Sequence, residues 1–378
     1  MKGFYEFFAG GGMVRAALGS DWRCLLANDI CARKGEVYAA NWGSESLVVA
    51  DIHQLALHDL PSHAALAWAS FPCQDLSLAG NGAGLAGERS GAFWGFHKLM
   101  QGLANAGRKP RLIALENVTG AITSNDGQDF QALIQAIASL GYRVGALVMD
   151  AVHFLPQSRP RVLIVGLDAD FDPPAELTTG TPVPGWHPRA LIGAHRSWPA
   201  ALREQWLWWN LPPPRLRVTP LEQLIELEPK DVPWHTAAET EKLLNMMSPA
   251  NRRKVLAAQA GGQRRIGTLY QRTRAGQQRA EVRFDGISGC LRTPAGGSSR
   301  QKILVVQGSS IRSRLLSARE AARLMGLPDS YRLPARYNEA YHLAGDGVAV
   351  PVVAHLARHL LEPLMLLAPA ASFDRLAA

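Results

Sequence analysis

The sequence predicts an α/β fold: a doubly wound, mostly parallel sheet with a smaller, irregular second domain. Two observations carry this prediction. Short apolar runs alternate with helix-like segments through the first 170 of the 378 residues, the order typical of crossover units. After Asp168 the chain becomes rich in proline and tryptophan, which indicates a change of domain.

Each strand of the sheet is predicted from a short apolar run that ends at a turn or at a polar residue. The predicted strands are residues 3–8, 24–29, 46–51, 64–71, 111–118, 142–151 and 160–167, and the predicted helices are 13–18, 31–42 and about 127–140. Residues 1–170 therefore form the first domain, which we expect residues 338–378 to complete by packing an apolar helix back onto the sheet.

Residues 171–337 are predicted to form the second domain and its hinge. The proline-rich stretch 171–188 is typical of a linker. Six of the ten tryptophans follow within residues 171–316, and their spacing favours a packed core over a ligand platform. Near the end, Ser317 and Glu320 form the pattern of a capping box, which predicts a helix that ends before Pro328.

The net charge is +8, and it is concentrated in one window. From Asn251 to Lys302 the chain carries 12 lysines and arginines against two acids. A solvated face is one explanation, but this density, interleaved with glycine and small polar residues, favours a polyanion partner. The arginines that we expect to contact it are Arg264, Arg265, Arg272 and Arg274.

The four cysteines, Cys24, Cys31, Cys73 and Cys290, have neither zinc-site nor disulfide spacing, so we expect free thiols in a reducing compartment and no metal. We find no apolar run long enough to span a bilayer. The N-terminal apolar run is interpreted as a strand and not as a signal peptide, because Glu6 and three glycines interrupt it.

A glycine-rich turn, FFAGGG at residues 7–12, follows the first predicted strand. Such a turn lets the backbone approach a ligand closely. Asp29 and Asp51 end the next two strands, where carboxylates face the crevice that binds nucleotides in such sheets, although both could simply cap helices. The turn lacks the GxGxxG spacing and the P-loop lysine, which favours a nucleoside ligand such as S-adenosylmethionine.

Cys73 directly follows Pro72 at the end of a buried strand. The next eighteen residues contain five glycines, and a connection of this length is either disordered or a functional lid. An inert structural thiol is the usual role of a lone cysteine, but this position and this loop favour a nucleophile.

Two further segments carry polar residues at strand ends. Glu116, in ALENV, ends an apolar strand, where a buried carboxylate is costly without a partner. In QSRPRV, Arg159 and Arg161 alternate along a strand, so their guanidiniums should point the same way and hold one acceptor. Surface solubility is the alternative role for these arginines.

Together these segments resemble the DNA (cytosine-5)-methyltransferases of bacterial type. The resemblance covers the whole catalytic part and rests on eight motifs in order: FYEFFAGGGMVRAAL, LLANDICARKGEVYAANW, VVADIHQL, ASFPCQDLSLAG, ALENV, QSRPRV, AREAARLMGLPDSY and AGDGVAVPVV. It implies a Rossmann-like fold that uses S-adenosylmethionine, with S-adenosylhomocysteine as the product. It also implies that residues 171–337 are a target-recognition domain that contacts DNA phosphates and base edges.

The resemblance implies a mechanism on a cytosine flipped out of double-stranded DNA. Cys73 attacks carbon 6, Glu116 binds ring nitrogen 3 and the exocyclic amine, and Arg159 contacts the base carbonyl and orients the cysteine. Residues implied to line the cofactor pocket are Phe8, Ala9, Gly10, Gly12, Asp29, Ile30, Asp51, Ile52, Pro72, Ala92, Asp346 and Val348. Residues implied to meet DNA as the loop closes are Gln74, Ser77, Arg89 and Arg161.

Three residues depart from the family pattern. Glu6 stands where an aspartate is usual, Ile30 where an aromatic residue often covers the adenine, and Asp346 where an asparagine is usual. The aspartate adds a negative charge that attracts the sulfonium or disturbs the pocket.

Two alternatives remain open: a transfer-RNA methyltransferase on the same scaffold, and a catalytically inactive DNA-binding relative. The long region between the catalytic segments favours DNA, and intact Cys73, Glu116, Arg159 and Arg161 argue against an inactive protein. The resemblance further implies a monomer in the bacterial cytoplasm, associated with the nucleoid and with no membrane, either solitary or paired with a restriction endonuclease that acts separately.

Overall fold

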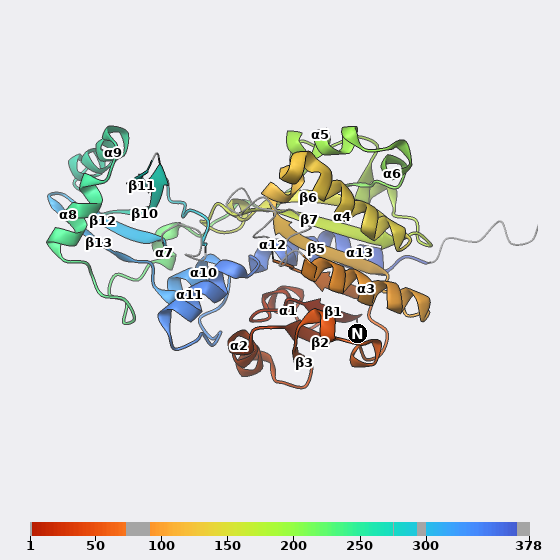
Figure 1. Cartoon of the computed structure of the whole chain (residues 1–378). Helices are drawn as coiled ribbons and strands as arrows, with labels where there is room; N and C mark the ends of the chain where they lie inside the picture. The colour runs from red at the N-terminus through yellow and green to blue at the C-terminus, as the bar shows by residue number, and fades with distance from the viewer. Residues whose placement is uncertain (1, 73–90, 275, 293–299, 369–378) are drawn as a thin grey trace, which may run out of the picture. The chain divides into compact units, whose positions relative to one another are not determined.

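The computed structural model describes residues 2–72, 91–274, 276–292 and 300–368, and it divides the chain into two compact units (Figure 1). The first, here called the sheet unit, contains Met1–Met149, Pro160–Pro213 and Val352–Ala378. The second, the insert unit, contains Asp150–Arg159 and Pro214–Pro351. These boundaries correct the predicted breaks after residues 170 and 337, and the tryptophans explain why.

The tryptophan-rich segment belongs to the core of the sheet unit. Trp198, Trp206 and Trp208 are each less than 9% exposed and pack in the same apolar cluster as the central strands. The prediction that they form a core is therefore confirmed, but the core is that of the first unit. Composition alone could not distinguish a new domain from an extension of the old one.

The sheet unit contains a seven-stranded sheet with the strand order β3-β2-β1-β4-β5-β7-β6. Its strands are β1 (Lys2–Phe7), β2 (Trp22–Asp29), β3 (Leu47–Val49), β4 (Leu66–Ala69), β5 (Leu112–Val118), β6 (Tyr142–Asp150) and β7 (Pro160–Asp168). The first five pair in parallel along the sheet, whereas β7 runs antiparallel to β5. The predicted doubly wound, mostly parallel sheet is confirmed.

Successive side chains of each strand point to opposite faces of the sheet, and each face is covered by its own apolar layer. Tyr5 and Phe7 of β1 pack in one layer with α3 and α4, while Ala27 of β2 packs in the other with Tyr38 of α2. The helices and short elements of this unit are α1 (Met13–Leu18), α2 (Ala32–Trp42), η1 (Ile52–Gln54), η2 (Leu57–Asp59), α3 (Gly91–Asn105), η4 (Thr119–Gly127), α4 (Gln128–Ser139), η6 (Ala175–Leu177), β8 (Thr178–Thr179), α5 (Arg189–Ser197), α6 (Ala200–Glu204) and β9 (Trp208–Trp209).

The C-terminal helices from Val352 onward belong to the sheet unit, whereas residues 338–351 of the predicted segment belong to the insert unit. These C-terminal helices are α12 (Val350–Leu356), the π-helical turn η7 (Ala357–Leu361) and α13 (Glu362–Met365). The Trp22 indole donates to the Glu362 carboxylate at 3.2 Å, and Arg111 donates to the carbonyl of Met365 at 2.7 Å.

Within the described residues, one helical stretch, Tyr337–Met365, could cross a membrane by length and composition alone, contrary to the expectation that no apolar run was long enough. Half of its most apolar window is buried inside the protein. Length and composition are weak evidence for a span, because a buried core helix has the same properties.

The insert unit is built on a four-stranded antiparallel sheet with the order β11-β10-β12-β13. Helices α8 and α9 cover one face, where Leu243, Val255, Leu269 and Leu304 share an apolar cluster. Its elements are η5 (Ala151–His153), α7 (Leu221–Leu224), α8 (Ala237–Asn245), α9 (Pro249–Ala260), β10 (Arg265–Arg274), β11 (Gln277–Arg283), β12 (Lys302–Gln307), β13 (Ser310–Leu315), α10 (Ala318–Leu324) and α11 (Tyr337–Asp346).

A fully buried ion pair lies in the insert unit. Arg314 and Glu320 both have 0% exposure, and the guanidinium donates to the two carboxylate oxygens at 2.6 and 2.8 Å. Glu320 also accepts the backbone N–H of Ser317, whose hydroxyl accepts the N–H of Glu320 at 3.1 Å. The predicted capping box is confirmed, and its carboxylate serves a second purpose as the partner of a buried arginine.

Candidate functional site

The candidate site lies at the carboxyl-terminal edge of the parallel strands. The strand order reverses between β1 and β4, and in open α/β sheets ligands bind at such a reversal. The ends of β1, β2, β4 and β5 all reach this edge because these strands are parallel. Since β7 is antiparallel to β5, its first residues reach the same edge, and Arg161 pairs with Val118.

The glycine turn after β1 has a backbone that depends on small residues. Gly10 and Gly12 have φ of 56° and 76°, in the left-handed region that favours glycine, and Phe8 has φ of 60°. A Cβ atom on Gly12 would lie 2.5 Å from the Trp42 indole nitrogen, whereas a Cβ on Gly10 would meet nothing within 4 Å. The turn is therefore closed toward α2 and open at Gly10, where a ligand can approach the backbone.

Asp29 holds this turn in place. One carboxylate oxygen accepts the N–H of Gly10 at 2.8 Å, and the other accepts the N–H of Cys31 at 2.8 Å. Asp51 accepts the N–H of His53 at 2.9 Å and so caps η1. The capping alternative is confirmed for Asp51, while Asp29 is not itself an N-cap, because that position is Cys31.

The remaining predicted cofactor residues of the sheet unit lie around the strand ends. Ile30 is 67% exposed directly after Asp29, whereas Ile52 is 4% exposed. Pro72 is exposed, Ala92 is half-buried in the first turn of α3, and Ala9 is buried and donates its N–H to the carbonyl of Asn28. An exposed isoleucine beside the glycine turn offers an apolar surface to a ring. Asp346 and Val348 belong to the insert unit, where Asp346 is exposed and ends α11, and Val348 is buried.

Glu116 has the partner that its burial requires. It is 8% exposed, and its Oε1 lies 2.9 Å from Nε of Arg161. The next residue, Asn117, donates from Nδ2 to the carbonyl of Phe71 at 3.4 Å and accepts the N–H of Val118 at 2.8 Å. The end of β5 is thus linked to the chain that leads into Pro72 and Cys73.

Arg159 and Arg161 do not hold one acceptor, so that prediction was wrong. The terminal nitrogens of Arg159 donate to the carbonyls of Leu291, Gly345 and Gly347 at 2.7 to 3.0 Å, all within the insert unit. Arg159 is 2% exposed and both terminal nitrogens are engaged by protein carbonyls, which argues against its predicted contact with a base. The two arginines do alternate along the chain, as the prediction assumed. However, Arg159 ends a segment of the insert unit and Pro160 begins a segment of the sheet unit, so the two side chains have different partners.

Several predicted residues lie outside the described ranges or in the insert unit. Cys73, Gln74, Ser77 and Arg89 lie outside the described residues. Arg264 and Arg265 are exposed at the start of β10, Arg272 is exposed within it, and Arg274 is its last residue.

Sequence reasoning missed two residues that shape the site. The Trp42 indole donates to the carbonyl of Gly11 at 2.9 Å, and the Asn28 amide donates to the carbonyls of Val48 and Ala50 at 3.1 and 2.9 Å. Trp42 carried no signal, because it reads as one more apolar residue of a helix. Asn28 could have been noticed as an amide at a buried strand end.

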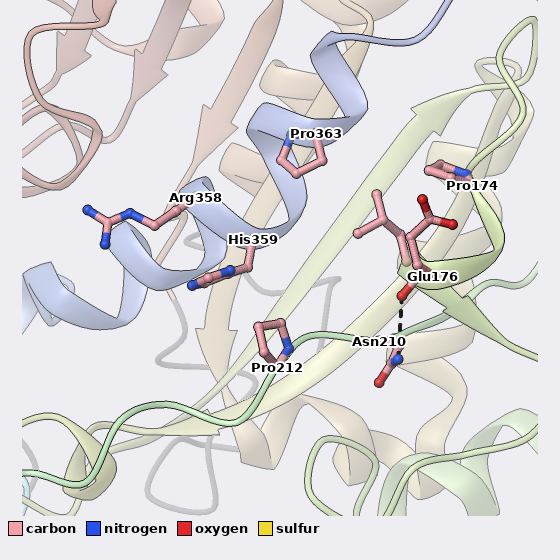
Figure 2. A pocket seen from close by; sticks show the side chains of 8 residues that line it. Pro174, Glu176, Asn210, Pro212, Arg358, His359 and Pro363 are labelled. Carbon is pink, nitrogen blue, oxygen red and sulfur yellow. Dashed lines mark hydrogen bonds between the residues drawn. The ribbon is translucent and has the colours of Figure 1, made fainter.

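A separate hollow of about 350 Å³ lies elsewhere on the sheet unit (Figure 2). Its lining residues are Pro174, Glu176, Leu177, Asn210, Pro212, Arg358, His359 and Pro363. None of the predicted site residues lines it, so the candidate site rests on the strand ends and not on this hollow.

Comparisons with known proteins show the family of the chain. Residues 3–362 match the family model of the C-5 cytosine-specific DNA methylases. The chain is 26% identical to the type II methyltransferase M.NlaX of Neisseria lactamica, over 95% of this chain and 96% of that protein. It is 25% identical to the type II methyltransferase M.HhaI of Haemophilus parahaemolyticus, over 94% and 93%.

The fold is also that of solved methyltransferase structures. A crystal structure of the Schizosaccharomyces pombe Dnmt2 methyltransferase superimposes with a TM-score of 0.61 at 18% identity, covering 96% of this chain and 99% of that one. Since the family model spans nearly the entire chain, including the glycine turn, the Glu116–Arg161 pair and the insert unit, the chain belongs to the C-5 cytosine-specific DNA methylases.

Proposed function

We propose that this enzyme transfers a methyl group from S-adenosylmethionine to carbon 5 of a cytosine flipped out of a specific double-stranded DNA sequence, through a covalent adduct of Cys73. The observation that carries the proposal is the edge where β5 and β7 meet. There Glu116 pairs with Arg161, and Asn117 holds the carbonyl of Phe71, two residues before Cys73.

The chemistry requires a transient covalent bond. Carbon 5 of cytosine is a poor nucleophile until a thiolate adds to carbon 6. The Cys73 thiolate forms the bond to carbon 6, and the ring then takes the methyl group at carbon 5. Loss of the carbon 5 proton and departure of Cys73 restore the aromatic ring. Free cysteine has a pKa of about 8.5, so the site must favour the thiolate.

Glu116 and Arg161 are suited to hold the base during these steps. The Glu116 carboxyl would bind ring nitrogen 3 and the exocyclic amine, which offsets the charge that develops on the ring. Arg161 fixes the orientation of Glu116 through the contact of 2.9 Å between its Nε and the Glu116 carboxylate.

The residues around the glycine turn fit S-adenosylmethionine. Gly10 is open to an approaching ligand, Asp29 supplies a carboxylate beside it, and exposed Ile30 offers an apolar face to the adenine. When bound, the cofactor supplies an electrophilic methyl group on a positively charged sulfur. The turn has no lysine for a phosphate chain, in keeping with a nucleoside ligand.

We expect Arg161→Ala to lower kcat for methyl transfer by roughly 10²–10³-fold, the scale on which loss of one preorganised donor acts. The variant leaves the Glu116 carboxylate buried without its partner, so its stability should be compared with that of Arg161→Lys. If single-turnover rates with saturating cofactor and DNA remain at the wild-type value in Arg161→Ala, the role of this pair is refuted.

The exposed end of the β10–β11 pair in the insert unit is suited to DNA phosphates. Arg272 of β10 stands directly opposite Arg279 of β11, and both are exposed. Like charges at opposed positions destabilise a sheet unless an anion lies over them. The Arg272 guanidinium also stacks 4.5 Å from the Tyr270 ring centroid, and Arg312 stacks 3.9 Å from Trp234.

We expect Arg272→Ala and Arg279→Ala each to weaken DNA binding and to reduce the slope of log K against log salt by about one, because each removes one phosphate contact. Arg283→Ala is the matched control, since Asp285 already neutralises Arg283 through a contact of 2.8 Å. Binding isotherms at four salt concentrations measure the slope. Equal slopes in all four proteins would show that this end of the β10–β11 pair does not meet phosphates.

The overall proposal is tested by incubating the protein with labelled S-adenosylmethionine and either duplex DNA or transfer RNA. Label in DNA supports the proposal, whereas label in transfer RNA alone favours the RNA alternative. Bisulfite sequencing of DNA from expressing cells then gives the methylated sequence. We further propose a monomer in the bacterial cytoplasm, solitary or paired with a restriction endonuclease.

A further inference from the structure

A buried carboxylate lies beneath the glycine turn. Glu6 of β1 is 1% exposed, and within the described residues neither of its oxygens accepts a hydrogen bond of normal geometry. It is two residues before Phe8, on the face of the sheet opposite to Tyr5 and Phe7. Such a group is costly to bury in its ionised form.

Polar side chains of three elements surround Glu6. Arg15 of α1, Cys24 of β2 and Tyr38 of α2 form one network, in which Arg15 donates to the Tyr38 hydroxyl at 3.0 Å and Cys24 lies 3.4 Å from it. Arg15 also donates to the Ser46 hydroxyl at 3.3 Å. The guanidinium is the cation of this cluster that favours the ionised form of Glu6.

Burial raises the pKa of Glu6 to about 8, although Arg15 and the backbone N–H groups of Val14 and Arg15 oppose the shift. The negative charge of Asp29 raises it further. Burial and then the charge of Glu6 raise the pKa of Cys24 to about 11. Near neutral pH the titrating member of the cluster is therefore Glu6.

The cluster is connected to the turn in two ways. Arg15 stacks 5.4 Å from the Trp42 ring centroid, and the Trp42 indole holds the carbonyl of Gly11. Asp29, which accepts the N–H of Gly10, acts on Glu6 through its charge. A positive charge placed at the turn should therefore act on Glu6 in the opposite direction.

We propose that Glu6 is a proton-linked positioning residue for the cofactor: a cationic ligand at the glycine turn binds with loss of a proton from the Glu6 carboxyl. The inference rests on the proposed use of S-adenosylmethionine, whose sulfonium carries that charge. S-adenosylhomocysteine lacks the sulfonium charge, so the protein should release fewer protons when it binds the product. Product release would then be coupled to reprotonation of Glu6.

Isothermal titration of the full-length protein with S-adenosylmethionine at pH 7, in buffers of different ionisation enthalpy, measures the protons released. The α-amino group of the ligand titrates in the same range, so Glu6→Gln is the matched variant that subtracts its contribution. We expect the wild type to release up to one more proton than Glu6→Gln. Below pH 8, the association constant of the wild type should rise with pH more steeply than that of Glu6→Gln, by up to a further factor of ten per pH unit. Glu6→Asp should retain the effect.

Unfolding of the ligand-free protein gives a second measurement in case Glu6→Gln binds poorly. The folded protein keeps the Glu6 proton to about pH 8, whereas the unfolded chain loses it near 4.5. The contribution of Glu6 to stability therefore falls as the pH rises through this window, and Glu6→Gln should remove that fall.

Binding with equal proton release in wild type and Glu6→Gln, together with unchanged pH profiles of unfolding, would overturn this inference alone. If folded wild type binds no S-adenosylmethionine at any pH from 6 to 9, the proposed cofactor is wrong and the inference falls with it.

Discussion

Cys73→Ser should lower the rate of methyl transfer by roughly 10⁴–10⁶-fold, the range over which removal of a catalytic nucleophile acts in other covalent enzymes. A serine hydroxyl is far less ionised than a thiol near neutral pH, so it cannot add to carbon 6 at a useful rate. Methyl transfer under single-turnover conditions measures the effect. DNA affinity should stay near the wild-type value, because Cys73 contributes one small side chain to a large interface.

Trapping gives the control for this prediction. Duplex DNA with 5-fluorocytosine cannot lose a proton from carbon 5, so the wild-type enzyme with S-adenosylmethionine should remain covalently attached to it. Cys73→Ser should form no adduct. Cys24→Ser, which changes a thiol in the network around Glu6, should still form one. Wild-type turnover in Cys73→Ser, or a stable adduct with it, would exclude Cys73 as the nucleophile.

Glu320→Ala should destabilise the insert unit by about 3–5 kcal/mol, because it leaves the Arg314 guanidinium buried without its carboxylate. Both side chains have 0% exposure, and Glu320 also accepts the N–H groups of Glu226 and Ser317. Urea denaturation followed by tryptophan fluorescence measures the loss, since Trp234 lies 5.2 Å from Arg314.

Two variants distinguish the stability lost by breaking the buried pair from the stability lost by removing any charge. Asp329→Ala breaks an ion pair of 2.7 Å between exposed Asp329 and Arg323, and should cost no more than about 1 kcal/mol. Replacing Arg314 and Glu320 together by methionine should recover much of the lost stability, because no unpaired charge is then buried. A cost for Glu320→Ala as small as that for Asp329→Ala would contradict the argument.

Much of the local structure of both units could be predicted because many elements obey local rules. The helix 13–18 was placed correctly between a strand and a glycine, and the capping box at Ser317 and Glu320 was found from two residues. The acids at strand ends were also found, since parallel strands bring their carboxyl ends to one edge.

The rest depended on pairing that is not local. That β7 runs antiparallel to β5, and so brings Arg161 beside Glu116, cannot be derived from either segment. Arg159 and Arg161 look equivalent in sequence, yet one binds carbonyls from residues 291, 345 and 347 while the other binds a carboxylate. The sequence shows Glu6 as a charged residue within an apolar strand, but it does not show the side chains that surround the carboxyl, because they come from three elements that meet only in the fold.

The division of the chain into units determines which segments must be transferred together when hybrid enzymes are made. The insert unit is formed by two separate segments, Asp150–Arg159 and Pro214–Pro351, and Arg159 of the short segment donates to carbonyls of the long one. A transplant of residues 214–351 alone would leave those carbonyls without their guanidinium. A hybrid that keeps these contacts therefore carries the ten-residue segment 150–159 together with the long one, as a single two-piece module.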